Sequence, residues 1–207
     1  MKVSVSILKE KNNIEETIKK INNTNASFVH LDIMDGTFTN TTSFKLNELL
    51  NINSKKKYDI HIMSTNLDYQ IKEAIKLKPE FITFHYESTK DVLKYIKLVK
   101  DNNIKVGLAI NPKTSIWKVK KYFNFIDLLL IMSVEPGMGG QEFKLSVIKK
   151  INKINKKKND FLISVDGGIN DKTIGLIRDK VDIIVSGSYI TNSENYDEVI
   201  NKLIENK

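Results

Sequence analysis

The sequence predicts an α/β protein with a single (β/α)8 barrel, also called a TIM barrel. Eight short runs rich in β-branched residues recur along the 207 residues, and longer amphipathic stretches lie between them. This length is at the small end of the range for the fold, which begins near ~200 residues. An open doubly wound sheet usually has a glycine-rich turn after its first strand, whereas Leu8, Lys9 and Glu10 follow here. We therefore expect residues 1–207 to form one barrel domain.

Each predicted strand is a short apolar run between polar residues. In chain order the strands are Val3–Leu8, Phe28–Met34, Tyr58–Met63, Phe81–His85, Lys105–Ile110, Phe125–Ser133, Phe161–Asp166 and Asp182–Ser186. In barrels of this kind the chemistry lies at the C-terminal ends of the strands. The active site is therefore expected there.

Helices are predicted between the strands by apolar residues that recur three and four positions apart. The clearest patterns cover residues 14–21, 92–99 and 147–154, another helix begins at Asn170, and the last covers Tyr196–Ile204. The periodicity is shortest over Thr41–Leu50 and Ser115–Phe123.

The chain has no cysteine, which excludes disulfide bonds, thiolate-bound zinc and cysteine nucleophiles. Any metal ion must therefore be bound by histidines and carboxylates. No stretch approaches the roughly 18 consecutive apolar residues of a membrane span, and Met1–Leu8 is too short for a secretory signal. We expect a cytoplasmic protein with no membrane partner.

The chain is basic, with 33 Lys and Arg against 25 Asp and Glu and a formal net charge of +8. Only Arg178 is an arginine, however, and arginine is the residue that reads phosphates and bases in a bidentate way. The runs Lys55–Lys57 and Lys156–Lys158 are not interleaved with aromatic residues, as single-strand binding requires. These lysines are expected to be solvated surface, and no nucleic-acid partner is predicted.

The three histidines of the chain all lie at or near the ends of predicted strands. In the second strand His30 and Asp32 are two residues apart, so they face the same side of the sheet. His61 lies in the third strand, and Asp166 ends the seventh. Two imidazoles and two carboxylates that converge on one barrel mouth favour a site for one divalent ion, Zn2+ in the first place, with Fe2+, Mn2+ or Co2+ as alternatives.

Glycines form a second signal, because six of the nine lie after the sixth, seventh and eighth strands. They are Gly137, Gly139, Gly140, Gly167, Gly168 and Gly187, the last followed by Ser188. Backbone N–H groups without side chains can approach an anion closely, and barrels often bind phosphate at the loops after strands seven and eight. A phosphorylated small molecule is therefore the expected ligand.

A metal ion beside two carboxylates, with a phosphate-binding site at one side, indicates an enzyme that acts next to the carbonyl of a sugar phosphate. One carboxylate would remove a proton from the adjacent carbon. A second carboxylate on the opposite face would return it with inversion, which is epimerisation. A single base on one face would give isomerisation instead.

At these residues the sequence closely resembles the ribulose-phosphate 3-epimerase family, from Ser6 to about Ile190. The segments that carry the resemblance are Ser6–Leu8, His30–Gly36, Asp59–Met63, Thr83–Glu87, Gly107–Pro112, Met132–Phe143 and Val165–Ile169. No single segment is specific for this family, but the combination of all seven segments is. The resemblance implies a (β/α)8 barrel that interconverts D-ribulose 5-phosphate and D-xylulose 5-phosphate in the pentose phosphate pathway, and it suggests a homo-oligomer.

Carried over by position, the resemblance implies roles for individual residues. The metal ligands would be His30, Asp32, His61 and Asp166, of which Asp32 and Asp166 would also be the acid/base pair. Ser6 and His61 would lie near the sugar hydroxyls. The residues around substrate and phosphate would be Gly137, Met138, Gly139, Gly140, Gly167, Gly168, Gly187 and Ser188. The pocket would be lined by Met34, Met63 and Met132. His85 receives no role beyond packing or hydrogen bonding.

The main departure from the family pattern follows Gly36. The family usually has His-Phe-Val-Pro-Asn there, whereas this chain has Thr37–Thr41 with the sequence Thr-Phe-Thr-Asn-Thr. An altered loop at this place could admit a six-carbon substrate, so a D-allulose 6-phosphate 3-epimerase is one alternative. A relative without catalytic activity that binds a phosphate or a protein partner is the other, although all four ligand positions are intact.

Overall fold

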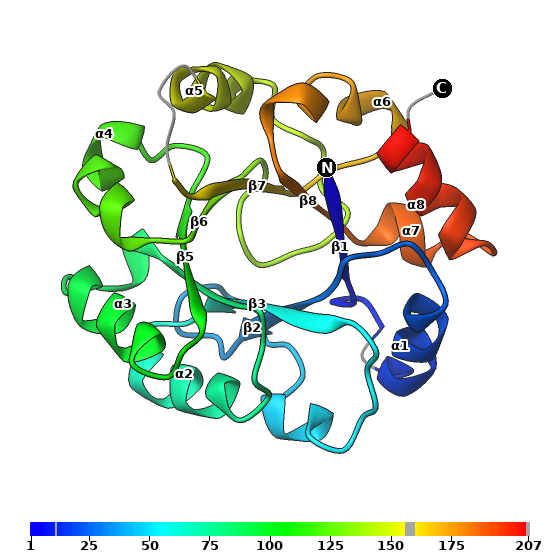
Figure 1. The fold of residues 1–207 in the computed structure, drawn as a ribbon, viewed down its shortest axis with the longest axis horizontal. Coiled ribbons are helices and arrows are strands. Elements are labelled where there is room, and N and C mark those ends of the chain that lie inside the picture. The colour runs from blue at the N-terminus through cyan, green and yellow to red at the C-terminus, as the bar shows by residue number, and fades with distance from the viewer. Residues whose placement is uncertain (11, 156–159, 206–207) are drawn as a thin grey trace.

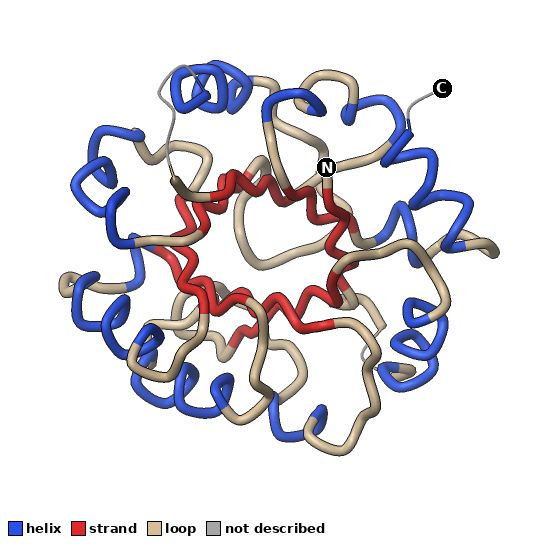
Figure 2. The backbone as a smooth tube through the Cα atoms, in the orientation of Figure 1, coloured by secondary structure: helices blue, strands red, loops and turns tan. Residues whose placement is uncertain are grey.

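The computed structural model describes residues 1–10, 12–155 and 160–205, and its centre is a closed parallel barrel of eight strands. Each strand pairs with the next in sequence, and β8 closes on β1 (Figures 1 and 2). The strands are β1 (Lys2–Ser6), β2 (Phe28–Met34), β3 (Lys57–Met63), β4 (Phe81–His85), β5 (Lys105–Ile110), β6 (Leu128–Met132), β7 (Leu162–Asp166) and β8 (Ile183–Ser186). The predicted fold class is confirmed.

Helices surround the barrel on the outside (Figure 2). They are α1 (Ile14–Asn22), α2 (Leu67–Ile75), α3 (Val92–Lys100), α4 (Ile116–Val119), α5 (Ser146–Asn155), α6 (Asp171–Ile174), α7 (Ser188–Thr191) and α8 (Tyr196–Glu205). The apolar face of α1 shows why they pack there, since Ile14, Ile18 and Ile21 are buried against the strands while Lys19 and Lys20 face solvent.

Several predicted elements differ from the structure in their bounds, and β1 ends at Ser6, two residues before the predicted end at Leu8. The segment Thr41–Leu50 contains only a 3-10 helix at Leu46–Leu49, because Thr42 pairs with Asp35 and so holds the first part extended. The sixth strand is shorter than Phe125–Ser133, because Phe125 ends a 3-10 helix. Asp127 then turns the chain into β6 by exchanging hydrogen bonds with the backbone of Val106.

Side chains alternate along each strand between the surrounding helices and the barrel interior. The interior is apolar beside β5, β6 and β8, where Ala109, Leu130 and Val185 pack in one cluster. Beside β1 to β4 and β7 it also contains polar side chains, although Phe28 and Phe81 belong to the apolar cluster. The buried polar side chains there are Ser4, Ser6, His30, Asp32, Asp59, His61, Thr83, His85 and Ser164. The barrel interior therefore combines an apolar cluster with a group of buried polar side chains that is available for chemistry.

Gly107 of β5 is required by this interior packing. A Cβ at Gly107 would lie 2.1 Å from Thr83 Oγ1 and 3.0 Å from Leu128 Cδ2, so Gly107→Ala is expected to destabilise the protein by about 1–3 kcal/mol through overpacking. Gly175→Ala is the matched control, since a Cβ there meets nothing within 4 Å and the backbone is helical. Urea denaturation of both variants is the measurement. Equal stability of the two would contradict the assigned interior contacts.

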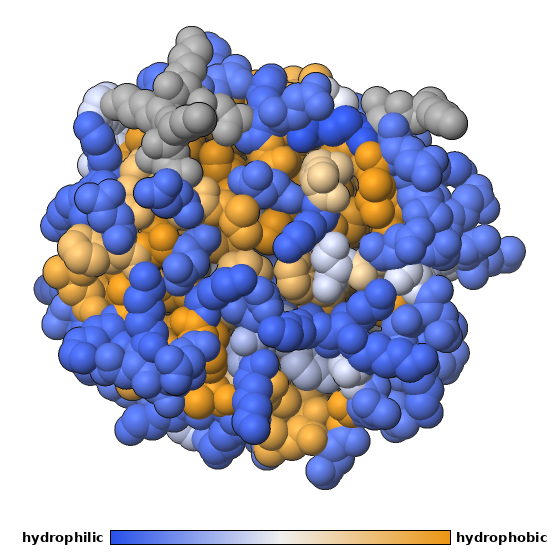
Figure 3. Space-filling view, in the orientation of Figure 1, coloured by the Kyte–Doolittle hydropathy of each residue, from blue (hydrophilic) through white to orange (hydrophobic). Residues whose placement is uncertain are grey.

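The surface carries the lysines that make the chain basic. Lys55 and Lys57 are exposed, as predicted, whereas Lys56 is half-buried and its Nζ donates to the Thr24 carbonyl at 2.8 Å. Lys156–Lys158 lie outside the described residues. On the face in Figure 3, hydrophilic side chains are spread around the periphery, with hydrophobic ones between them. Among the described residues, no helix is long and apolar enough to cross a membrane.

Candidate active site

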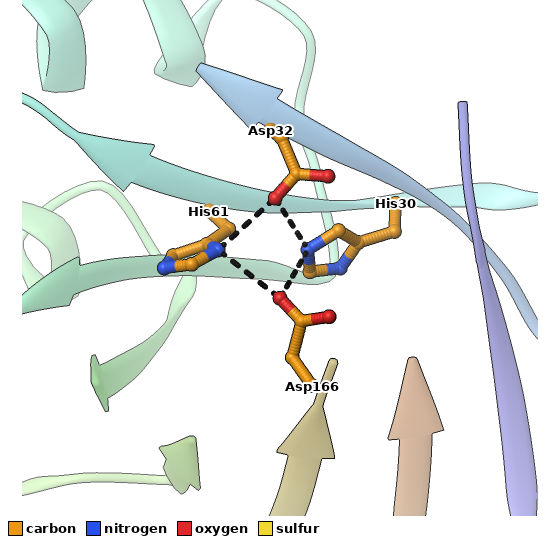
Figure 4. Close-up of side chains that lie close together, drawn as sticks. All are labelled: His30, Asp32, His61 and Asp166. Atoms are coloured by element: carbon orange, nitrogen blue, oxygen red, sulfur yellow. Dashed lines mark hydrogen bonds and ion pairs between the residues drawn. The ribbon is translucent and has the colours of Figure 1, made fainter. Parts of the chain in front are cut away.

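Strands β2, β3 and β7 bring four side chains together inside the C-terminal end of the barrel (Figure 4). The residues are His30, Asp32, His61 and Asp166. His30 Nε2 lies 3.4 Å from Asp32 Oδ1 and 4.0 Å from Asp166 Oδ2. His61 Nδ1 lies 3.2 Å and 3.7 Å from the same two oxygens. The alternation predicted along the second strand is correct, because Leu31 and Ile33 face the outer core instead.

These four atoms fit a divalent metal ion. A tetrahedral site with bonds of ~2.0–2.1 Å has ligand atoms about 3.4 Å apart. The four nitrogen-to-oxygen distances above bracket that value, and all four ligand atoms lie within 4.8 Å of one another. His30 Nε2 is buried and has no hydrogen-bond partner, although it points at both carboxylates. A buried ring nitrogen left in this state is costly unless a cation or proton satisfies it. The donor set of two imidazoles and two carboxylates suits Zn2+ and the alternatives expected from the sequence.

Asp59 of β3 holds the His30 ring in this orientation. Its Oδ2 lies 2.8 Å from His30 Nδ1 and accepts a hydrogen bond of 2.8 Å from the Ser4 hydroxyl. When the ring proton is on Nδ1, it is donated to the Asp59 carboxylate, and the Nε2 lone pair faces the cluster. This is the usual outer partner of a metal-binding histidine.

The two carboxylates of the cluster have opposite electrostatic environments. Burial opposes ionisation of Asp32, but the His30 and His61 rings outweigh it and hold the pKa of Asp32 well below its usual range. The second oxygen of Asp32 accepts a 2.7 Å hydrogen bond from Ser6. Burial, together with the negative charge of Asp32, raises the pKa of Asp166 to about 7. Asp32 is therefore ionised at neutral pH, whereas Asp166 retains its proton up to about pH 7, which is the division of roles expected of an acid/base pair.

A cavity of about 320 Å³ opens above the cluster. Asp32, Asp166, Met63 and Met132 line it together with Ser6. The predicted residues that line its other parts are Gly137, Met138, Gly139, Gly140, Gly167, Gly168, Gly187 and Ser188. The loop between β6 and α5, which contributes four of them, crosses the barrel opening in Figure 2. His61, which the resemblance placed near the sugar hydroxyls, is fully buried and is not among the residues that line the cavity.

Met34 does not line this cavity. It is 4% exposed, and its Sδ lies 3.2 Å from the Thr41 hydroxyl oxygen, beneath the loop that follows β2. The same hydroxyl donates to the carbonyl of Gly137 at 2.7 Å. The altered Thr37–Thr41 segment therefore joins the β2 loop to the β6 loop at the side of the cavity, which explains why Met34 is covered.

The glycine loops approach one another too closely for side chains. A Cβ at Gly168, which has φ +64°, would lie 2.4 Å from the backbone nitrogen of Phe143. A Cβ at Gly140 would lie 2.8 Å from Lys9 Nζ and 3.8 Å from Ser188 Oγ. Gly140, Lys9 and Ser188 all line the cavity, and the part of the cavity between the ammonium group and the hydroxyl group is called the recess at Gly140.

Lys9 is a cavity residue that the sequence analysis did not select. It is the one cation among the described residues that line the cavity. Its only signal in the sequence was its place directly after the first strand, since the loops after barrel strands carry function.

Comparison with known proteins agrees with this architecture. Residues 2–191 match the ribulose-phosphate 3 epimerase family. A ribulose-phosphate 3-epimerase of Buchnera aphidicola subsp. Baizongia pistaciae is 39% identical over 195 residues, which cover 89% of this chain and 86% of the relative. One from Helicobacter pylori strain 26695 is 35% identical, covering 94% of this chain and 92% of the relative. A structure of Mycobacterium tuberculosis tryptophan synthase shares the fold alone, with a TM-score of 0.75 at 6% identity over 98% of this chain and 91% of that chain.

Fold and site together define a (β/α)8-barrel enzyme whose polar groups gather at the C-terminal strand ends. The match over nearly the whole chain narrows this class further. The chain belongs to the ribulose-phosphate 3-epimerase family and is an isomerase of the carbohydrate epimerase type.

Proposed function

We propose that this protein interconverts D-ribulose 5-phosphate and D-xylulose 5-phosphate, as a step of the pentose phosphate pathway in the cytoplasm. The observation that carries the proposal is the pair Asp32 and Asp166. These two carboxylates come from β2 and β7, lie at the base of one cavity, and have pKa values held apart. Figure 4 supports a two-base reaction, since the carboxylates approach the imidazoles from opposite sides.

The substrate phosphate would occupy the recess at Gly140, between Lys9 and Ser188. Backbone N–H groups of the glycine loops and the Lys9 ammonium supply the donors and the positive charge that a phosphate requires. The sugar carbons would then extend across Met63 and Met132 toward the carboxylates. Ser6, whose hydroxyl contacts Asp32, lies at the place where a sugar hydroxyl would reach the base.

Proton transfer would use the two carboxylates in turn. The ionised Asp32 is suited to accept the proton from the third carbon, and the protonated Asp166 is suited to deliver one to the opposite face. In the reverse direction the two residues exchange roles. The net result is inversion at one carbon with no change in overall protonation.

A divalent metal ion held by His30, Asp32, His61 and Asp166, with Zn2+ the first candidate, would stabilise the negative charge that develops on the substrate oxygens. His30 and His61 would act as neutral ligands, and the ionised Asp32 would offset part of the charge of the ion. The donor chemistry and the unpartnered His30 Nε2 support this part of the proposal.

The test is proton NMR of D-ribulose 5-phosphate in D2O with the purified protein, before and after treatment with a chelator. We expect deuterium to enter at the third carbon and D-xylulose 5-phosphate to form. Both should stop after chelation and resume when Zn2+ or another divalent ion is added, because the charge on the substrate oxygens is then stabilised again.

Absence of exchange in folded, metal-loaded protein would overturn the proposal. The same experiment with D-allulose 6-phosphate then tests the six-carbon alternative, for which the altered Thr37–Thr41 segment is the relevant feature. Phosphate-ligand binding without exchange on either substrate would indicate a relative that has lost catalysis. A homo-oligomer, expected from the resemblance, and the lack of a nucleic-acid partner remain predictions.

A further inference from the structure

His61 has a second buried neighbour on the side away from the carboxylates. Its Nε2 lies 2.8 Å from Nε2 of His85, the last residue of β4. The two rings stack, with centroids 4.9 Å apart and planes inclined by 28°, and both side chains are fully buried. Phe38 covers the far side of His85 at a centroid distance of 4.7 Å. Water therefore has no access to this contact.

The contact continues to a carboxylate. His85 Nδ1 lies 3.3 Å from Oε2 of Glu87. The other oxygen, Oε1, accepts hydrogen bonds from the Asn111 N–H at 2.9 Å and from the Thr114 hydroxyl. Lys150 fixes the same loop by donating to the Asn111 and Pro112 carbonyls. Hydrogen bonds from the loop after β5 thus hold the Glu87 carboxylate in place.

Three contacts in a row join Asp32, His61, His85 and Glu87, and each contact needs one proton. Both ends are carboxylates, which only accept hydrogen bonds when ionised. His61 can bind a metal ion only through an unprotonated ring nitrogen, and two neutral imidazoles carry one ring proton each, so the pair supplies two protons. The three contacts therefore share only two protons, so one contact lacks a proton. A cation at one end of the row takes the place of the missing proton.

The ionised Glu87 decides which end lacks the proton. It requires the proton of His85 on Nδ1, so His85 Nε2 must accept from His61 Nε2–H. The His61 Nδ1 lone pair then faces Asp32 and Asp166. With the opposite tautomers, Glu87 Oε2 would face a ring nitrogen without a proton, and two acceptors would be buried against each other.

We propose that Glu87 and His85 are positioning residues that fix the tautomer of His61 and so make its Nδ1 available to a divalent metal ion. The proposal rests on the metal-dependent function above and extends it to residues that contact neither metal nor substrate. Each histidine of the cluster is then oriented by an outer carboxylate. His30 contacts Asp59 directly, and His61 is connected to Glu87 through His85. Outer partners of this kind typically change metal affinity by about 10- to 100-fold.

The test compares Glu87→Gln with Glu80→Gln. Both remove one carboxylate charge next to β4, and the side chains are similarly exposed, 21% for Glu87 and 17% for Glu80. Glu80 instead pairs with Lys57 and Lys105 at the opposite end of the strand. Zn2+ affinity is measured by competition with a chromophoric chelator. Glu87→Gln should weaken Zn2+ binding by about 10- to 100-fold, while Glu80→Gln leaves it unchanged.

A spectroscopic measurement reports the tautomer itself. In zinc-loaded wild-type protein with 15N-labelled histidine, we expect a 15N–15N coupling across the His61 Nε2–H to His85 Nε2 hydrogen bond, and we expect its loss in Glu87→Gln. Thr114→Val retains the Glu87 charge but removes one of its hydrogen bonds, so a smaller loss of Zn2+ affinity should follow. Circular dichroism verifies that each variant is folded.

Equal Zn2+ affinity of wild type and Glu87→Gln would overturn the inference, even if the wild type epimerises the sugar phosphate. The expected loss of affinity in a protein inactive on both sugar phosphates would support the inference while the proposed substrate fails. A wild-type protein that binds no divalent ion would overturn the inference and the metal part of the proposed function together.

Discussion

Asp32→Asn and Asp166→Asn are each expected to lower the epimerisation rate by about two to four orders of magnitude, the range that a positioned acid or base contributes. Asparagine has nearly the same shape and retains an oxygen for a metal ion, but it can neither accept nor deliver the proton. The rate is followed by NMR as formation of D-xylulose 5-phosphate. Circular dichroism and zinc content serve as controls for folding and metal loading.

Isotope exchange distinguishes a reaction with two bases from a reaction with a single base. In a two-base reaction each variant retains the base for one face, so it should still exchange the substrate proton of one epimer with D2O while forming no product. The two variants should show this exchange with opposite epimers. If both variants exchange the same epimer, or if either turns over at a near-normal rate, the assignment of Asp32 and Asp166 as a pair is wrong.

Ser188→Asp is expected to raise KM for the phosphorylated substrate with a smaller effect on kcat. A carboxylate at this position lies beside the recess at Gly140, where it would face the phosphate. Repulsion between unit charges about 4 Å apart is ~1 kcal/mol in water and ~4 kcal/mol near a protein surface. Since about 1.4 kcal/mol is a factor of ten, the expected increase in KM is at least several-fold. Steady-state kinetics measures it.

Ser115→Asp is the matched control for this experiment. It adds the same charge at the residue that precedes α4, where aspartate is a favoured helix cap, and Ser115 is not among the residues that line the cavity. Its KM should match that of the wild type. An unchanged KM in Ser188→Asp would move the phosphate away from the recess between Lys9 and Ser188.

Local patterns were sufficient for most of the fold. The alternation of short apolar runs with amphipathic stretches predicted all eight strands, and the ends of β2, β4 and β5 agree to the residue. The errors fall where tertiary contacts override local preference. The segment after β2 has a weak helical pattern, but its Thr41 hydroxyl is bonded to Gly137, far away in the sequence.

Some residues of the candidate site could likewise be selected from the sequence, and others could not. His30 and Asp32 could be selected from their spacing alone, because a strand turns alternate side chains to one face. Asp59 and Glu87 could not be selected by that reasoning. An acidic residue in a strand is ordinary in a sequence, and only the packing of β1, β3 and β4 shows that these carboxylates orient the rings of His30 and His85.

The sequence by itself determined the barrel, the polar strand ends and the glycine-rich turns, because these follow from periodicity and from residue chemistry within a few positions. Only the tertiary structure decided that Asp32 and Asp166 have opposed electrostatic environments, that Met34 lies outside the cavity, and that Lys9 lies beside Gly140. The physical reason is that burial, charge and hydrogen bonding at one atom are set by neighbours from other strands. Their distances are fixed when the sheet closes on itself and not before.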